Sequence, residues 1–268
     1  MPEGDTIFRA ARTLHAALAG KVITRFETVL PQLARIDDQA PLAGRTVTRV
    51  VSEGKNLVMD FSGNLHLRTH MRMNGSWHIY RPGERWRKSR GDMRIVLETA
   101  DWVAVAFNVP VAEFHDARSL ERQEDLRLIG PDFAAAEFDF DEALRRIRAR
   151  GGSEIADVIL NQRVVAGIGN EYKSEVLFIS RVHPFARVEQ LSDEQLLRIL
   201  QHGRKLMLAN VNKRSAARIT TFSLDPSEGQ YVYGRGRKPC RRCGTPIEYA
   251  KQGPDARGTY WCPRCQPA

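Results

Sequence analysis

Four cysteines near the C-terminus have the spacing of a metal site. They form two Cys-X-X-Cys pairs, Cys240–Cys243 and Cys262–Cys265, with eighteen residues between the pairs, and the 268-residue chain has no other cysteine. Two such pairs supply four thiolates, the ligand set of a structural zinc ribbon. Disulfides between these cysteines are disfavoured, because they would need an oxidising compartment and the start of the chain does not indicate one. The spacing therefore predicts one structural zinc ion, with no open position on it for a substrate.

Positive charge is concentrated in the same part of the chain. The net charge is +9, and between Lys213 and Cys265 eleven Lys and Arg stand against four Asp and Glu. A charged stretch is often only a solvated surface. Because most of the net charge falls in a short part of the sequence, it also matches the electrostatic footprint of a protein that binds phosphates. We therefore expect a polyanionic partner.

Three further polar residues stand at predicted turns. Lys55 lies between two β-rich runs, Asn170 follows two glycines at the start of a predicted helix, and Arg257 lies between the cysteine pairs, where a β-hairpin would turn. The first amides of a helix can bind a phosphate. Each of the three could equally be a solvated turn residue, and the residues alone do not decide between these interpretations.

The elements that must carry these residues change type along the chain. An amphipathic helix is predicted from Asp5 to Leu18, followed to Phe107 by short β-rich runs that turn residues separate. This pattern is typical of an antiparallel sandwich. Beyond a charged linker, helical spacing predicts four helices: Asp141–Arg150, Glu154–Gln162, Glu171–Ile179 and Ser192–Val211.

Four separated motifs occur in an order that resembles one known family. They are Pro2-Glu3-Gly4 after Met1, Lys55 in a turn, the string from Ala166 to Glu175, and the terminal cysteine ribbon. Over essentially its full length the chain is similar to the formamidopyrimidine-DNA glycosylase and endonuclease VIII family. The resemblance implies an α+β fold with an N-terminal antiparallel β-sandwich and leading helix, a helical helix-two-turn-helix domain and a C-terminal zinc ribbon.

The resemblance implies that Pro2 is a nucleophile. Removal of Met1 would expose its secondary amine; an α-amino group titrates near ~8 and a lysine near ~10.4, so the terminal amine is deprotonated far more often at neutral pH. Attack on the sugar C1′ gives a Schiff base, from which base loss and strand cleavage follow. The matching role of Glu3 is general acid at the sugar ring oxygen. Lys55 would approach the lesion's phosphate or the departing base.

Other residues are implied to bind DNA. Asn170 would bind a backbone phosphate at the helix start, with Lys173 as its neighbour, and Arg257 would grip the phosphate beside the flipped nucleotide as a catalytic and binding residue. Met73 matches the residue that fills the space left by a flipped base. By alternation, however, Met73 shares a face with Leu65, so it could instead belong to the core.

The sequence departs from the family in two places. Asp5-Thr6 replaces a common Pro-Glu pair, so the second N-terminal carboxylate is displaced or missing. The stretch Phe107–Phe114 lacks the Asp-Pro-Arg-Arg-Phe of oxidised-guanine enzymes, whose Arg and Phe enter the duplex. Together with the Pro-Glu-Gly start, this favours the endonuclease VIII branch and oxidised pyrimidines as substrates.

We therefore expect a base-excision-repair DNA glycosylase with AP lyase activity, which cleaves the strand by β/δ-elimination. One alternative is an oxidised-purine glycosylase of the same family. Another is a non-catalytic, zinc-containing protein that binds damaged DNA, which would explain the charge and the cysteines but leave Pro2, Glu3 and Lys55 without a role. A zinc hydrolase is disfavoured because no open three-ligand site is recognisable.

The expected organisation has four parts: a catalytic sandwich domain (1–122), a linker (123–134), a helix-two-turn-helix DNA-binding domain (135–230) and a zinc finger (231–268). The expected partner is damaged DNA, as a duplex or also as a single strand or bubble. We expect a monomer without a membrane association. The start of the chain has neither the basic nor the apolar region of a signal peptide, so we expect a cytoplasmic protein, at the nucleoid when it acts.

Overall fold

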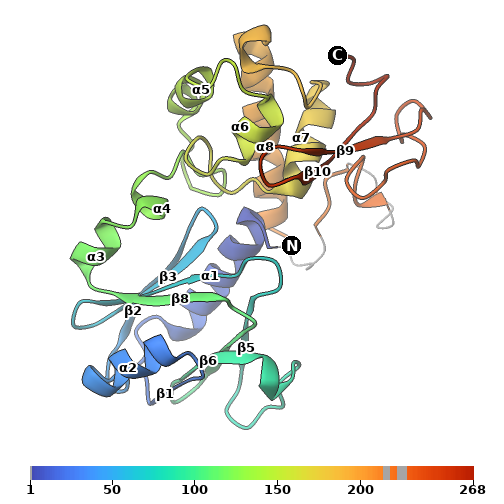
Figure 1. Cartoon of the computed structure of the whole chain (residues 1–268). Helices are drawn as coiled ribbons and strands as arrows, with labels where there is room; N and C mark the ends of the chain where they lie inside the picture. The colour runs from blue at the N-terminus through green and yellow to red at the C-terminus, as the bar shows by residue number, and fades with distance from the viewer. Residues whose placement is uncertain (1, 214–217, 222–227) are drawn as a thin grey trace. The chain divides into compact units, whose positions relative to one another are not determined.

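A computed structural model of the chain consists of two units, residues 1–128 and residues 129–268 (Figure 1). The structure describes residues 2–213, 218–221 and 228–268. The expected α+β class is confirmed, with antiparallel sheets in the first unit and helices followed by a hairpin in the second. The finer division into four parts, with its boundaries at 122, 134 and 230, stays a prediction.

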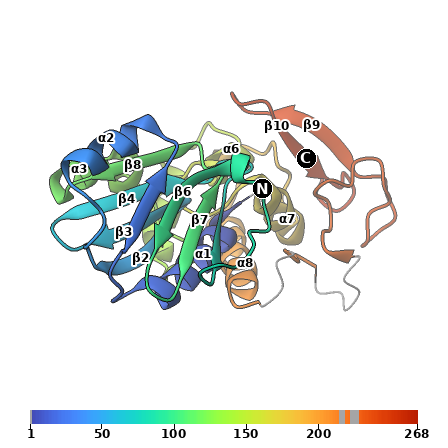
Figure 2. The same ribbon diagram turned by 90° about the horizontal axis from the view of Figure 1, so that it is seen from below.

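Two four-stranded antiparallel sheets form the first unit. Figure 2 shows β6 between β1 and β7 in the sheet of order β1-β6-β7-β5, whose strands are Arg25–Thr28, Met93–Glu98, Val103–Phe107 and Ser76–Tyr80. The other sheet has the order β2-β3-β4-β8, with strands Val47–Glu53, Asn56–Phe61, Leu65–His70 and Val111–His115. The predicted antiparallel sandwich is therefore confirmed.

The core of this unit lies between the two sheets and helix α1 (Gly4–Leu18). In β3 the alternate residues Leu57, Met59 and Phe61 are buried in it, as the two-residue period of a strand requires. The helix contributes Ile7 and Leu14, together with other apolar residues at helical spacing. The apolar residues from which the first helix was predicted therefore lie on the face that the helix buries.

Helix α1 runs antiparallel to β2, and this direction decides which residues meet. Near its C-terminal end, the Nδ1 atom of His15 accepts a hydrogen bond of 3.2 Å from the amide of Val50. Just beyond the helix, the amide of Gly20 donates to the carbonyl of Val47 at the start of β2. The beginning of α1 therefore lies toward the opposite end of β2, where the turn to β3 carries Lys55.

Three helices of this unit were not predicted. Helix α2 (Pro31–Gln39) has proline at its first position, where the missing amide hydrogen costs nothing. Helices α3 (Ala117–Glu121) and α4 (Glu124–Arg127) are only five and four residues long. Segments this short contain little more than one turn, so their apolar residues cannot show a helical period.

The second unit contains the predicted helices with ends shifted by a few residues. They are α5 (Phe140–Arg148), α6 (Ile155–Leu160), α7 (Asn170–Ser180) and α8 (Asp193–Val211). The side chain of Gln162 shapes the turn between α6 and α7, because its Nε2 donates to the carbonyl of Ile168 and its Oε1 accepts from the amide of Gly167, each at 3.0 Å. The unit ends in the hairpin of β9 (Glu248–Gln252) and β10 (Arg257–Trp261). Of the helices described, none has the length and apolar character needed to cross a membrane.

We predict that Gly75→Ala destabilises the first unit. A Cβ atom on Gly75 would lie 2.5 Å from the carbonyl oxygen of Met71, which is backbone and cannot move aside cheaply. Overpacking of this kind costs roughly 1–3 kcal/mol. Urea unfolding should report this loss, whereas Gly152→Ala, where a Cβ atom meets nothing within 4 Å, should stay close to the wild type. Equal stability of the two variants would contradict the prediction.

Candidate active site and nucleic-acid interface

Lys55 lies in a tight turn at one end of the sheet β2-β3-β4-β8. Strand β2 ends at Glu53 and β3 begins at Asn56, so Gly54 and Lys55 form a two-residue hairpin turn. Gly54 has a φ of 58°, in the left-handed region that such turns favour and that glycine adopts without strain. The turn therefore presents Lys55 at a fixed place beside the next strand.

His70 occupies the same end of the sheet and was not singled out from the sequence. It pairs with Asn56 in the β3–β4 register, next to Lys55. Its Nδ1 atom accepts a hydrogen bond of 3.0 Å from the amide of Arg72. Burial and the nearby cations Arg72, Lys55 and Arg68 lower the pKa of His70 to about 4. His70 is therefore a neutral imidazole in a cationic environment at physiological pH.

Arg68 anchors this cationic end of the sheet from within. Its guanidinium is buried and contacts Asn56 Oδ1 at 3.1 Å, Glu113 Oε2 at 2.8 Å and Asp125 Oδ2 at 3.3 Å. Asp125 belongs to α4, so this ion pair ties the last helix of the first unit to the middle of β4. The contacts fix Arg68 in place, two residues from His70.

Glu3 lies directly before α1, and its side chain is fully buried. Its backbone carbonyl accepts from the amides of Thr6 and Ile7, while its carboxylate makes no capping hydrogen bond to the helix. The preceding residue, Pro2, is half-buried. Because α1 begins toward the Lys55 end of β2, the N-terminal residues and the Lys55–His70 group share one end of the first unit.

Asp5 is the second carboxylate of this N-terminus. It is fully buried, pairs with Arg9 at 3.6 Å and accepts a hydrogen bond of 3.4 Å from the hydroxyl of Thr6. An acid in the first turn of a helix also interacts favourably with the helix dipole. The N-terminus therefore carries a buried carboxylate one position before the place where the family motif has its glutamate.

Met73 lies in the turn after β4, not in the strand. The strand ends at His70, so the alternation that placed Met73 on the core face stops three residues before it. Its side chain is 60% exposed, which makes the alternative assignment of Met73 to the core wrong. The amide of Gly75 donates to the carbonyl of Met71 and closes the turn. An exposed apolar side chain on a closed turn is suited to enter a base stack.

The connection between β7 and β8 is only three residues long. Asn108 adopts a φ of 51°, and Val109 is fully buried. Phe114, the last aromatic residue of this stretch, packs against the core and against the ring of Phe26, with the centroids 5.7 Å apart. No long loop therefore extends from residues 107–114.

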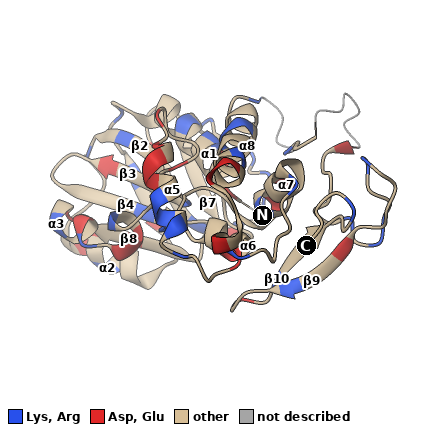
Figure 3. Cartoon of the chain, turned by 90° about the horizontal axis from the view of Figure 1, so that it is seen from above, with Lys and Arg blue, Asp and Glu red and all other residues tan. Residues whose placement is uncertain are grey.

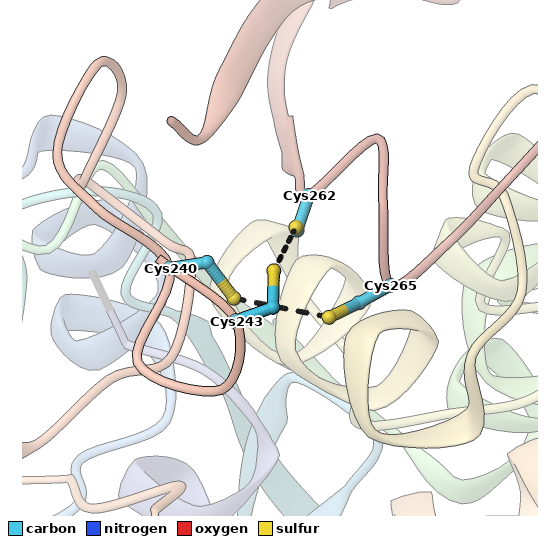
Figure 4. A group of neighbouring side chains, drawn as sticks. All are labelled: Cys240, Cys243, Cys262 and Cys265. Carbon is cyan, nitrogen blue, oxygen red and sulfur yellow. Dashed lines mark hydrogen bonds between the residues drawn. The ribbon is translucent and has the colours of Figure 1, made fainter. Parts of the chain in front are cut away.

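The four cysteines form a compact metal site, shown in Figure 4. Cys240 Sγ lies 3.9 Å from Cys265 Sγ, Cys243 Sγ lies 3.5 Å from Cys262 Sγ, and all four sulfur atoms lie within 4.8 Å of one another. Zinc–sulfur bonds of ~2.3 Å in a tetrahedron require sulfur atoms about 3.8 Å apart. The cysteines therefore fit one zinc ion, which would hold the ribbon together.

Asn170 and Lys173 of α7 both contact β10. Asn170 Nδ2 donates to the carbonyl of Gly258 at 2.8 Å, while its Oδ1 is buried and has no hydrogen-bond partner among the described residues. Lys173 is fully buried, and its Nζ donates to Thr259 Oγ1 at 2.7 Å. The expected phosphate contact of Lys173 is not supported by this position, because its ammonium group points into the protein.

Arg257 is the first residue of β10, and its side chain is exposed. Its guanidinium contacts Asp255 at 3.1 Å. Ion pairs also occupy Arg241, with Glu228, and Arg218, with Glu171. Figure 3 likewise shows an acidic as well as a basic stretch on the β9–β10 hairpin. Ion pairs with residues of the protein itself thus partly neutralise the positive charge of the C-terminal part of the chain.

We predict that His70→Gln reduces the loss of stability in acid. Below about pH 6.5 the unfolded chain binds a proton at a histidine, which the folded chain takes up at His70 only near pH 4. Stability therefore falls as the pH is lowered through this window. Melting temperatures of the variant should fall less than those of the wild type between pH 6.5 and 4. Curves that stay parallel across this range would contradict the prediction.

Comparisons with known proteins cover the whole chain. Residues 1–122 match the formamidopyrimidine-DNA glycosylase N-terminal domain, residues 129–222 its H2TH domain, and residues 237–268 the zinc finger found in FPG and IleRS. The chain is 40% identical to the "Probable endonuclease 8 2" of Streptomyces coelicolor, covering 99% of this chain and 94% of that protein. It is 36% identical to the "DNA-(apurinic or apyrimidinic site) lyase Nei2" of Mycolicibacterium smegmatis, over the full length of both.

A solved structure has the same fold. The complex between Lactococcus lactis Fpg and DNA containing an abasic site aligns with a TM-score of 0.84 over all of both chains, at 22% identity. The family models and the relatives at 40% and 36% identity confirm the family resemblance inferred from the motifs. The chain belongs to the formamidopyrimidine-DNA glycosylase and endonuclease 8 family.

Proposed function

We propose that this protein removes oxidised pyrimidines from DNA through a Schiff base on Pro2 and cuts the strand by β/δ-elimination. Membership of the family makes it a DNA glycosylase with AP lyase activity in base excision repair. The lesion class and the roles of individual residues are the proposal. The observation that carries it is the buried Glu3 beside Pro2, at the same end of the first unit as Lys55 and His70.

The chemistry begins with the removal of Met1, which converts the amide nitrogen of Pro2 into a secondary amine. This amine attacks C1′ of the damaged nucleotide, and Glu3 donates a proton to the ring oxygen, so that the C1′–O4′ bond breaks and the sugar opens. The damaged base then leaves C1′ with the electrons of its glycosidic bond and takes up the proton that the Pro2 nitrogen loses, which gives an iminium ion. The iminium ion acidifies the C2′ proton, whose removal expels the 3′ phosphate by β-elimination, and a second elimination expels the 5′ phosphate. Lys55 and the neutral His70 would contact the phosphate or the leaving base.

Three further residues would contact the DNA. Asn170 at the start of α7 and Arg257 of β10 would bind phosphates flanking the lesion, and Met73 would fill the space left by the flipped base. The expected partner is damaged DNA, as a duplex or also as a single strand or bubble, bound by a monomer. We further propose that the protein acts in the cytoplasm, at the nucleoid.

The preference for pyrimidines rests on the connection between β7 and β8. Extrusion of a stacked base costs a few kcal/mol, and least for a base that is already poorly stacked. The three-residue connection has a buried Val109 and carries neither the Arg nor the Phe with which oxidised-guanine enzymes enter the duplex. Such an enzyme is better suited to lesions such as thymine glycol, which stack poorly, than to 8-oxoguanine paired with cytosine.

We predict that borohydride traps a covalent complex between the protein and DNA with an abasic site. Trapping should be strongly reduced in Pro2→Gly, because a flexible primary amine replaces the secondary amine held in the ring. It should also be strongly reduced when Met1 is retained, because the nitrogen of Pro2 is then an amide. DNA binding by the Met1-retaining form serves as the control and should stay largely intact. Undiminished trapping with Pro2 blocked would move the nucleophile elsewhere, and no trapping at all would favour the non-catalytic DNA-binding alternative.

We predict faster single-turnover excision of thymine glycol or 5-hydroxyuracil than of 8-oxoguanine opposite cytosine. The same lesions should be excised from single strands or bubbles as well, because residues 107–114 lack the Arg-Phe pair that would read the opposite base. The measurement is an excision panel on matched duplexes and single strands. Preferred removal of 8-oxoguanine from duplex DNA would assign the protein to the purine branch instead.

A further inference from the structure

A buried row of hydrogen bonds connects α7, both strands of the ribbon hairpin and the start of α6. Lys173 Nζ donates to Thr259 Oγ1 at 2.7 Å, Thr259 Oγ1 donates to Gln252 Oε1 at 2.8 Å, and Gln252 Nε2 donates to Glu154 Oε2 at 2.7 Å. Lys173 and Thr259 are 0% exposed and Gln252 is 4% exposed. We call these four residues the buried relay.

The direction of every hydrogen bond in the buried relay is set by Lys173. An ammonium group can only donate, so the hydroxyl of Thr259 must accept from it and use its own hydrogen elsewhere. That hydrogen goes to Gln252 Oε1, which orients the amide so that Nε2 faces the carboxylate of Glu154. A cation at one end and an anion at the other therefore leave a single arrangement of donors and acceptors.

The buried relay surrounds the backbone of Arg257. Gln252 is the cross-strand partner of Arg257, and Thr259 lies two residues after it on the same strand. Between them, the carbonyl of Gly258 accepts from Asn170 Nδ2 at 2.8 Å. The two residues that follow Arg257 and the residue opposite it are thus all fixed by buried side chains, while the tip of the hairpin is exposed.

We propose that Lys173, Thr259 and Gln252 are positioning residues that hold Arg257 where it meets a DNA phosphate. This inference rests on the proposed function of Arg257. A side chain as long as arginine reaches a defined point only if its backbone is held, and a misplacement of about 1 Å can cost up to about a hundredfold in rate. The buried relay supplies that constraint without touching DNA.

The experiment disrupts the buried relay and tests whether the resulting loss of activity depends on Arg257. Thr259→Val deletes the hydroxyl in a side chain of the same shape, and Thr259→Ser keeps it as the matched control. Because Thr259→Val leaves a buried ammonium group short of a partner, the double variant Lys173→Met/Thr259→Val is made as well, which replaces both groups by apolar ones. Zinc content and melting temperature establish that each variant is folded.

Single-turnover excision should slow roughly tenfold or more in Thr259→Val and in the double variant, and should stay near the wild-type rate in Thr259→Ser. In an Arg257→Ala background the same substitutions should cause almost no further loss, because residues that act as one unit are not additive. If the substitutions slow excision equally in the presence and in the absence of Arg257, the proposal is overturned. An unchanged excision rate in folded Thr259→Val, or in Arg257→Ala, would overturn it as well.

Hydrogen exchange of free protein provides a readout independent of activity. Amides of residues 253 and 255–258 should exchange faster in Thr259→Val and the double variant than in the wild type, and unchanged exchange would overturn the proposal. If the wild type neither excises bases nor forms a trapped complex, the proposed function fails. The exchange comparison then still decides whether the buried relay holds the hairpin.

Discussion

The buried carboxylate of Glu175 is the interaction on which the second unit depends most. It lies on α7 with no exposure, and accepts hydrogen bonds of 2.8 Å from the backbone amides of Tyr231, Val232 and Tyr233. The hydroxyl of Thr220 donates to it as well. Burial raises the pKa of Glu175, and these four donors oppose the shift by favouring the charged form. A buried carboxylate without such donors would cost several kcal/mol.

Helix α7 is therefore more than a support for a phosphate site. Within its first two turns it places Asn170 against Gly258, Glu171 against Arg218, Lys173 against Thr259, and Glu175 against the segment before the ribbon. This explains why its side chains are buried almost all round, although the helix carries several charges. Its polar groups serve as the partners of a ribbon too small to bury a core of its own.

Features encoded in neighbouring residues could be predicted from the sequence. The cysteine spacing, the amphipathic pattern of α1 and the glycine turn before α7 can each be recognised within a short stretch of the sequence. Each was found where expected. Lys173 could not be placed in this way, because its partner Thr259 is 86 residues away. His70 carried no local signal either. Its unusual environment arises only when the β3–β4 register brings it beside Lys55 and Arg68.

The short connection after β7 also bears on how this part of the protein could change during evolution. Asn108 already occupies the left-handed region, Val109 fills the core, and β8 begins two residues later. Point substitutions here exchange side chains without lengthening the backbone between the two strands. A longer loop at this place therefore requires inserted residues, so that length polymorphism, in addition to residue identity, is a variable to follow among diverging copies of this gene.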